Sequence, residues 1–255
     1  MGRSLVRAAH ASQDFTIIGA TERPGSGELG ADIGDLGGVG ALGLATQVSA
    51  LEAARTADVW VDFTSPVSTL EALYSLRQTS VRAAIIGTTG FNDAEDAALR
   101  AHGDRIAVVK AGNFSLGVNL LTALVRQAAQ RLGDDWDIEI LETHHRRKVD
   151  APSGTALMLA EGAAQGRGKP LSELRTPPYD GITGPRQSGT IGFSVRRAGG
   201  VVGDHEALFA SEDELVSLRH VAMDRSIFAR GALHAGRWAA QQSPGFYSMT
   251  DVLDL

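Results

Sequence analysis

The chain has 255 residues, of which 43% are hydrophobic and 21% charged, so it is long enough for one large domain or two modest ones with packed cores. A formal net charge of −6 and an aromatic content of 5% argue against a basic or base-stacking surface for nucleic acid. The absence of cysteine excludes disulfides, thiolate metal sites and cysteine nucleophiles. No membrane span or signal peptide is expected, and the lack of cysteine fits a reducing cytoplasm.

Taken in chain order, the first half alternates short apolar runs with helical patterns. The expected strands are Phe15–Ala20, Asp58–Thr64, Val81–Gly87 and Ile106–Val109, and the expected helices are Ala45–Ala57, Ser68–Gln78 and Ala94–His102. Strands separated by helices of this length predict βαβ units and a parallel sheet. The glycines crowded into Gly25–Gly43 predict a flexible surface excursion rather than a regular element.

The pattern changes near residue 115, which we take as a domain boundary. A long helix is expected over Val118–Leu132, and helical spacing returns at Ser226–Gln242. The strands expected between them are Trp136–Thr143, Thr190–Val195, Glu206–Ala210 and Leu215–His220. Because no regular crossover helices separate these strands, we expect a mixed sheet.

Small and polar residues follow three of the strands expected in the first half, at Phe63–Pro66, Gly87–Gly90 and Ala111–Phe114. Ligands of open α/β sheets bind at the carboxyl ends of the strands, and small residues there let a ligand approach backbone N–H groups. Ordinary tight turns are the alternative interpretation, and the sequence leaves both open.

The densest chemistry lies in residues 144–150, which hold two histidines, three fixed cations and one carboxylate in an acidic chain. A helix follows, with Pro152 suited to its first turn and Asp150 or Ser153 suited to cap it. The N–H groups of Ser153, Gly154 and Thr155 would then point out of the helix start beside these cations. Such an arrangement favours an anion, and a carboxylate fits it well.

His144 and Lys148 are the candidate proton donors, because histidine titrates near neutrality and a desolvated lysine beside other cations has a lowered pKa. A solvated loop of charges is the alternative. We expect no metal, because adjacent histidines point apart in a strand and the sequence offers no third ligand nearby.

The string ETHHRRKVDAPSGTA, from Glu142 to Ala156, resembles the signature of the 4-hydroxy-tetrahydrodipicolinate reductase (dihydrodipicolinate reductase) family. Further segments agree in order along the chain: Asp62–Thr64, Gly87–Phe91, Asn113–Asn119, Gly189–Phe193 and Met249–Leu253. The resemblance spans essentially the whole chain. It implies an NAD(P)H-dependent oxidoreductase that reduces 4-hydroxy-tetrahydrodipicolinate to tetrahydrodipicolinate in the diaminopimelate route of lysine biosynthesis.

The resemblance also implies an α/β fold with two domains. Residues 1–114 and 226–255 would form a Rossmann-like dinucleotide-binding domain, and residues 115–225 an α+β domain that binds substrate and assembles a homotetramer. His144 and Lys148 would be the catalytic acid and base residues. The substrate dicarboxylate would contact His145, Ser153, Gly154 and Thr155. The cofactor would contact Gly2, Gly87, Thr88, Thr89, Ala111, Gly112, Asn113 and Phe114.

Glu22 stands where the family places the acidic residue that contacts the adenosine ribose, and Arg23 lies beside it. The carboxylate suits a ribose hydroxyl and the guanidinium a 2′-phosphate, so both NADH and NADPH stay open.

The chain departs from the family at its N-terminus, where the first strand and the glycines of a GxxGxMG turn are absent. Losing that strand would unpair its two neighbours in the sheet. We favour a start assigned at an internal methionine over a natural chain with an impaired cofactor site. The rival functions are a non-catalytic dicarboxylate-binding or assembly protein, and a dehydrogenase of the same architecture that acts on another amino or imino acid.

Overall fold

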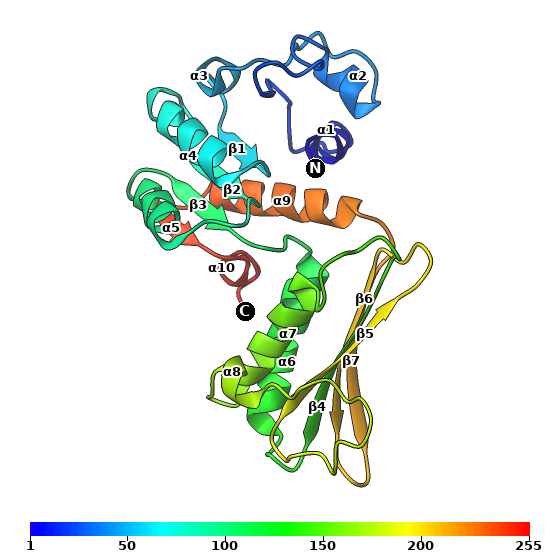
Figure 1. Ribbon diagram of the computed structural model, residues 1–255. Helices are drawn as coiled ribbons and strands as arrows, with labels where there is room; N and C mark the ends of the chain where they lie inside the picture. The colour runs from blue at the N-terminus through cyan, green and yellow to red at the C-terminus, as the bar shows by residue number, and fades with distance from the viewer. The chain divides into compact units, whose positions relative to one another are not determined.

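The computed structural model describes all 255 residues and divides them into two compact units (Figure 1). The first unit comprises Met1–Ser115 with Ser226–Asp254, and the second comprises Leu116–Arg225 with Leu255. None of the helices combines the length and the apolar character that a membrane crossing requires. Each unit has its own sheet, so each positions its own set of candidate functional residues.

Four parallel strands form the sheet of the first unit, in the order β1-β2-β3-β8. They are β1 (Val59–Asp62), β2 (Ala83–Ile86), β3 (Ala107–Lys110) and β8 (Gly245–Tyr247). Every residue of β2 is buried, as is usual for a strand of a parallel sheet covered on both faces. The parallel sheet predicted for the first half of the chain is confirmed.

The first unit also contains helices, several of which begin at recognisable capping residues. They are α1 (Gly2–His10), α2 (Ile33–Gly37), α3 (Ala50–Ala53), α4 (Pro66–Ser75), α5 (Asp93–Arg100), α9 (Ser226–Ala239) and α10 (Met249–Leu253), with the 3-10 turns η1 (Leu76–Gln78) and η2 (Ala101–Asp104). Ser65 caps α4, and Asn92 forms a capping box with Glu95 at the start of α5. Small buried residues let α9 pack closely on β1, β2 and β3 (Figure 1).

The prediction of a strand at Phe15–Ala20 is wrong, because no ladder joins this segment to the sheet. Only its end is held, where the N–H of Gln47 donates to the carbonyl of Ala20. The segment and β1 both line a cavity of about 300 Å³, and β1 pairs with β2 alone. A strand needs a partner backbone, so an extended apolar sequence without one stays irregular.

Two further predictions for the N-terminal part are wrong. The helix expected over Ala45–Ala57 is reduced to the short α3. The glycine-rich segment Gly25–Gly43 contains a regular element, α2, which is held by the carboxylate of its N-cap residue Asp32. That carboxylate accepts hydrogen bonds from the backbone N–H groups of Gly34, Asp35, Leu42 and Leu44. One side chain therefore organises a loop whose composition alone predicted mobility.

A mixed sheet in the order β5-β4-β6-β7 forms the second unit (Figure 1). Its strands are β4 (Asp137–His144), β5 (Ile191–Arg197), β6 (Gly203–Ala210) and β7 (Leu215–Ala222). β4 runs parallel to β5 and antiparallel to β6, and β7 is antiparallel to β6. The predicted mixed sheet is confirmed.

The helices α6 (Leu116–Arg131) and α7 (Gly154–Gly166) pack against each other in this unit, and α8 (Leu171–Leu174) follows. Their approach is close, because a Cβ at Gly166 would lie 2.4 Å from the carbonyl oxygen of Arg126. Val125 and Leu159 from these helices share one buried cluster with Ile138 and Phe209 from the sheet. This core holds the start of α7 beside the end of β4.

We expect the backbone amides of Phe15–Gly19 to exchange with D₂O much faster than those of Ala83–Ile86. Both segments are apolar, but only the second donates to neighbouring strands, and unprotected amides exchange without an opening step. Hydrogen exchange followed by mass spectrometry or NMR at neutral pH measures the difference. Equally slow exchange in the two segments would contradict the irregular structure of Phe15–Gly19.

Candidate active site

The start of α7 is built around Ser153, the N-cap residue of this 13-residue helix. Its hydroxyl accepts a hydrogen bond from the N–H of Ala156 at 3.1 Å, and its own N–H donates to Glu142 Oε1 at 2.9 Å. Pro152 precedes this cap, so the prediction that placed it in the first helical turn is wrong. Gly154 is exposed, and a Cβ there would meet nothing within 4 Å, so an anion can approach the backbone of the first turn.

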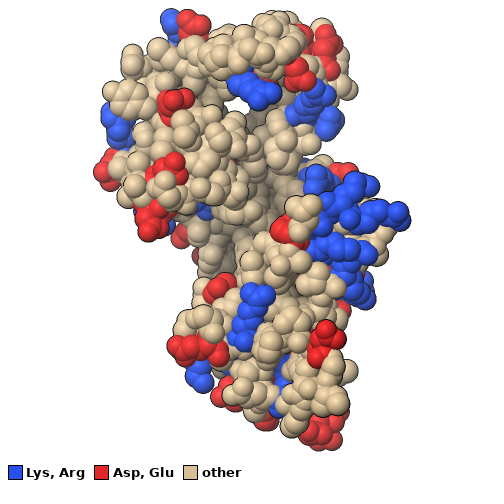
Figure 2. All heavy atoms as spheres, viewed as in Figure 1, with Lys and Arg blue, Asp and Glu red and all other residues tan.

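A cationic loop joins β4 to α7 and carries the consecutive cations Arg146–Lys148. Lys148 Nζ lies 2.8 Å from a carboxylate oxygen of Asp150, and this partner lowers the pKa of Asp150. Burial and the surrounding cations lower the pKa of His145. Figure 2 shows Lys and Arg side chains gathered in this unit near the loop that joins β5 to β6. This concentration of positive charge favours an anionic ligand.

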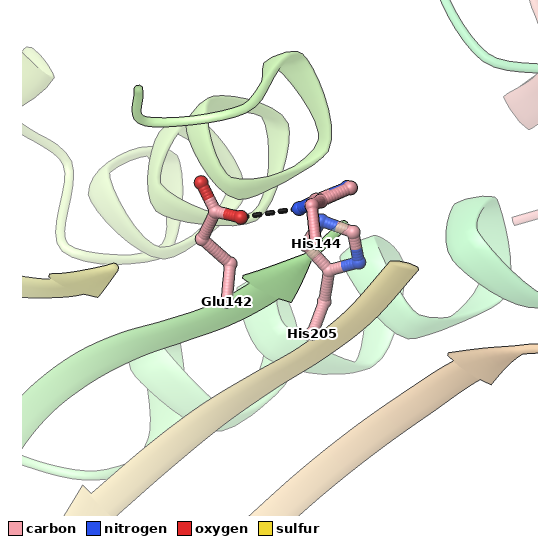
Figure 3. A group of neighbouring side chains, drawn as sticks. All are labelled: Glu142, His144 and His205. Carbon is pink, nitrogen blue, oxygen red and sulfur yellow. Dashed lines mark hydrogen bonds and ion pairs between the residues drawn. The ribbon is translucent and has the colours of Figure 1, made fainter. Parts of the chain in front are cut away.

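Three buried side chains gather beside this loop: Glu142 and His144 from β4, and His205 from β6 (Figure 3). Glu142 and His144 are two residues apart on one strand, so they point to the same face. Nδ1 of His144 hydrogen-bonds Oε2 of Glu142. His205 lies opposite Glu142 in the antiparallel register, and its ring meets that of His144 edge to face with centroids 4.9 Å apart.

Arg197, at the end of β5, holds the carboxylate of Glu142 from another side. Its Nη1 donates to Oε2 at 2.9 Å, and its Nη2 donates to Oε1 at 3.2 Å. Burial raises the pKa of Glu142, but the hydrogen bonds from Arg197, His144 and Ser153 outweigh it and hold that pKa below its ordinary value. Nη2 also donates to the carbonyl of Asp150 at 2.6 Å, which ties the cationic loop to the same carboxylate.

His205 is neutral in this arrangement, because burial, followed by the charge of His144, lowers its pKa from 6.5 to about 4. Its Nε2 lies 3.0 Å from the hydroxyl oxygen of Ser153. A hydroxyl carries one proton and two lone pairs, so Ser153 can accept from Ala156 and still hydrogen-bond His205 Nε2 in either tautomer of the imidazole. The hydroxyl of Ser153 is thus used twice within the protein.

One potential ligand atom from each of Glu142, His144 and His205 lies within 4.8 Å of the other two, so the structure brings together three groups of metal-binding type. The sequence had offered no third ligand beside the histidines. Both oxygens of Glu142 already accept hydrogen bonds, and the guanidinium of Arg197 would repel a cation. We therefore interpret the cluster as a hydrogen-bonded network.

In the first unit, the turns after β1 and β2 are joined by the buried carboxylate of Asp62. Oδ1 of Asp62 accepts from the N–H of Thr64 at 3.0 Å and from the hydroxyls of Thr69 and Thr88, each at 3.1 Å. Thr88, predicted to contact the cofactor, therefore directs its side chain into this network. The network holds two loops at the carboxyl edge of the sheet, where parallel sheets bind ligands.

The other turn residues predicted to contact the cofactor lie at the ends of β2 and β3. In order of decreasing exposure they are Thr89 and Gly112, then Gly87, Ala111 and Asn113, and finally the buried Phe114. A Cβ at Gly87 would lie 2.0 Å from the ring of Phe63, whereas one at Gly112 would meet nothing within 4 Å. Packing therefore requires glycine at position 87, while the backbone at Gly112 is open to a ligand.

Gly2, Glu22 and Arg23 lie away from these turns in the sequence. Gly2 begins α1 and lines the cavity of about 300 Å³ together with Glu22. The N–H of Arg23 donates to Glu22 Oε1 at 3.0 Å, and the Arg23 side chain is exposed. A carboxylate that accepts from ribose hydroxyls, and a guanidinium and open glycine backbone that donate to phosphates, together fit a dinucleotide.

The two units place the chain in a class of α/β proteins. One unit has a parallel sheet of the type that binds nucleotides, and the other offers a site for an anion. The family described as "Dihydrodipicolinate reductase, N-terminus" matches residues 1–114, and "Dihydrodipicolinate reductase, C-terminus" matches residues 117–253. The chain therefore belongs to the dihydrodipicolinate reductase family.

Individual relatives agree along the whole chain. The 4-hydroxy-tetrahydrodipicolinate reductases of Parvibaculum lavamentivorans and Dinoroseobacter shibae are each 50% identical to it, over 100% of this chain and 94% of each relative. The dipicolinate-bound dihydrodipicolinate reductase of Paenisporosarcina sp. TG-14 has a TM-score of 0.75 and 25% identity, over 97% of this chain and 92% of that chain. An amine dehydrogenase of Mycobacterium smegmatis, at 14% identity and a TM-score of 0.60 over 96% of this chain and 91% of that chain, shares the fold alone.

Sequence reasoning assigned no role to the residues that organise both sites. Glu142 stood in the recognised motif, and its spacing of two from His144 was the available signal. Asp62 likewise stood in a quoted segment without a role. Arg197 and His205 carried no signal, because Arg197 is 55 residues from its partner Glu142 and His205 is 52 residues from Ser153.

Asp62→Ala should lower the free energy of unfolding by about 1–3 kcal/mol, because the buried hydroxyls of Thr69 and Thr88 lose their carboxylate acceptor. The matched control is Asp58→Ala, which removes an ion pair with Arg82 whose side chains are 67% and 62% exposed. The control should cost less than about 1 kcal/mol. Urea denaturation compares the two, and equally small losses would contradict the organising role of Asp62.

Acid should destabilise the protein partly through His205. The folded imidazole stays neutral down to about pH 4, whereas the unfolded chain takes up a proton below pH 6.5. The free energy of unfolding therefore falls between these two values, by roughly 3 kcal/mol from this group, and levels off below them. His205→Gln should flatten the fall, whereas His10→Gln, at an exposed position on α1, should not. Denaturation curves across this pH range test the prediction; an unchanged slope in His205→Gln would contradict it.

Proposed function

We propose that this protein reduces 4-hydroxy-tetrahydrodipicolinate to tetrahydrodipicolinate with NADPH or NADH. The observation that carries the proposal is the 50% identity, over the whole chain, to relatives named for this reaction. The dipicolinate named in the Paenisporosarcina structure supports a ligand with two carboxylates on a ring. The cationic loop and the start of α7 offer this chain the complementary charge.

The second unit supplies the groups proposed to bind and protonate the substrate. One carboxylate is held by the N–H groups of Gly154 and Thr155 at the start of α7, where Ser153 sets the direction of the helix, and His145 contacts the substrate beside them. His144 or Lys148 delivers the proton. The overall change consumes one hydride and one proton and releases the hydroxyl group of the substrate as water, so positioning and general acid catalysis are the tasks of the protein.

The first unit supplies the groups proposed to hold the cofactor. Bound reduced nicotinamide provides the hydride. The contacts proposed for it come from Gly2, Gly87, Thr88, Thr89, Ala111, Gly112, Asn113 and Phe114. Glu22 favours a ribose hydroxyl and Arg23 a 2′-phosphate, so both NADH and NADPH stay in the proposal. The homotetramer implied by the family resemblance and the cytoplasmic location expected from the composition stay predictions.

Lys148→Ala and His144→Ala should each lower kcat by roughly 100-fold or more, since a general acid contributes at least that much. The KM for the nicotinamide should change little, because neither residue is assigned to the cofactor. Oxidation of NADH and of NADPH, followed separately with enzymatically generated substrate, measures both constants. Lys169→Ala, an exposed lysine near the other end of α7, is the control and should keep wild-type turnover.

Near-normal turnover in both His144→Ala and Lys148→Ala would remove the proposed proton donors. Absence of nicotinamide oxidation in the wild-type protein would favour the rival non-catalytic dicarboxylate-binding protein.

A further inference from the structure

Glu142 is only 1% exposed, and hydrogen-bond donors of the protein surround its carboxylate. Oε1 accepts from the N–H of Ser153 and from Nη2 of Arg197. Oε2 accepts from Nη1 of Arg197 and from Nδ1 of His144. A buried carboxylate is tolerated when donors surround it in this way. Because protein donors occupy both oxygens, Glu142 itself is not available to a ligand.

This bonding decides which nitrogen of His144 is available for chemistry. A carboxylate only accepts hydrogen bonds, so the contact requires a proton on Nδ1 of His144. Nε2 is then the nitrogen that can exchange a proton with another molecule. A Cβ at Gly203 would lie 3.3 Å from this Nε2, so the absence of a side chain at position 203 leaves room around it.

The same carboxylate also sets the start of α7. Its Oε1 takes the N–H of Ser153, the residue immediately before the first helical turn. One fixed charge, the carboxylate of Glu142, therefore sets the positions of both the His144 imidazole and the first turn of α7, which carries the N–H groups of Gly154 and Thr155. Arg197 keeps that charge in place and binds the carbonyl of Asp150, so the intervening loop is anchored too.

We propose that Glu142, clamped by Arg197, is a positioning residue that acts through His144: it fixes the tautomer and ring orientation of His144 relative to the start of α7. The inference rests on the proposed function, in which His144 exchanges a proton and the helix start holds a substrate carboxylate. In this arrangement one carboxylate keeps the proposed proton donor, His144, at a fixed distance and angle from the proposed carboxylate site at the start of α7. Small errors in such geometry are costly to rate.

The chain offers a matched control on the same strand. Glu139, three residues earlier on β4, is paired with Arg186, and this carboxylate–guanidinium pair does not contact His144. Glu142→Gln and Glu139→Gln therefore each remove one carboxylate charge from β4 with the shape preserved. Only the first should lower kcat, by roughly 10- to 100-fold, a part of what a general acid contributes. The KM for the nicotinamide should stay within about twofold in both variants.

A double-mutant cycle tests whether Glu142 acts through His144. If it does, Glu142→Gln should add little to His144→Ala, and the double variant should be within about threefold of His144→Ala alone. A Glu142→Gln loss that multiplies fully with the His144→Ala loss would overturn the proposal. Turnover of Glu142→Gln equal to that of Glu139→Gln would overturn it as well.

A readout independent of activity separates this inference from the proposed function. In ¹⁵N-histidine NMR spectra, His144 should carry its proton on Nδ1 in the wild type and in Glu139→Gln, and lose that preference in Glu142→Gln. An unchanged His144 tautomer in Glu142→Gln would sink the inference even if the protein is an active reductase. A changed tautomer in a protein without reductase activity would support the positioning while rejecting the proposed function.

A second variant covers the case in which Glu142→Gln does not fold. Arg197→Lys keeps the positive charge but cannot donate two parallel hydrogen bonds, and Arg186→Lys makes the same change at the control pair. We expect a lower kcat for Arg197→Lys than for Arg186→Lys, with both proteins folded by circular dichroism. Equal turnover of these two variants would count against the clamp.

Discussion

The second unit depends on one electrostatic requirement: a buried carboxylate must be surrounded by donors if it is to stay charged. Glu142 meets this requirement with groups from its own strand, from β5 and from the start of α7. Satisfying a single charge therefore brings three elements together at the end of β4. The same bonds that compensate the charge orient His144 and the helix start, so the stability of this region and the geometry of its site have one physical origin.

The first unit also contains a buried carboxylate that is surrounded by donors, but these donors are uncharged. Asp62 is also buried at the end of a strand, but threonine hydroxyls and a backbone N–H surround it instead of a guanidinium. Its network joins two loops and leaves backbone groups, such as those at Gly112, open at the edge of the sheet. The two units thus place different chemistry at strand ends: an oriented side chain in one, and open backbone in the other. This division fits a dicarboxylate and a dinucleotide respectively.

Backbone pairing explains where the N-terminal part departs from its local preferences. Phe15–Ala20 has the composition of a strand, yet it lies beside a cavity and has no ladder. Gly25–Gly43 has the composition of a mobile loop, yet the carboxylate of Asp32 gathers four backbone N–H groups and organises it. In both segments the outcome depends on which hydrogen-bonding partner is within reach rather than on local propensity.

The sequence by itself determined the parallel and mixed sheets, because periodicity is a local property of the chain, and the resemblance of the string Glu142–Ala156 indicated the family. It also predicted that the chemistry lies at His144, Lys148 and the start of α7. Only the tertiary structure decided that Arg197 and His205 join this region and that Glu142 is its centre. Side chains 55 residues apart in the sequence meet through strand order and register, and these follow from packing of the whole unit, which no local pattern encodes.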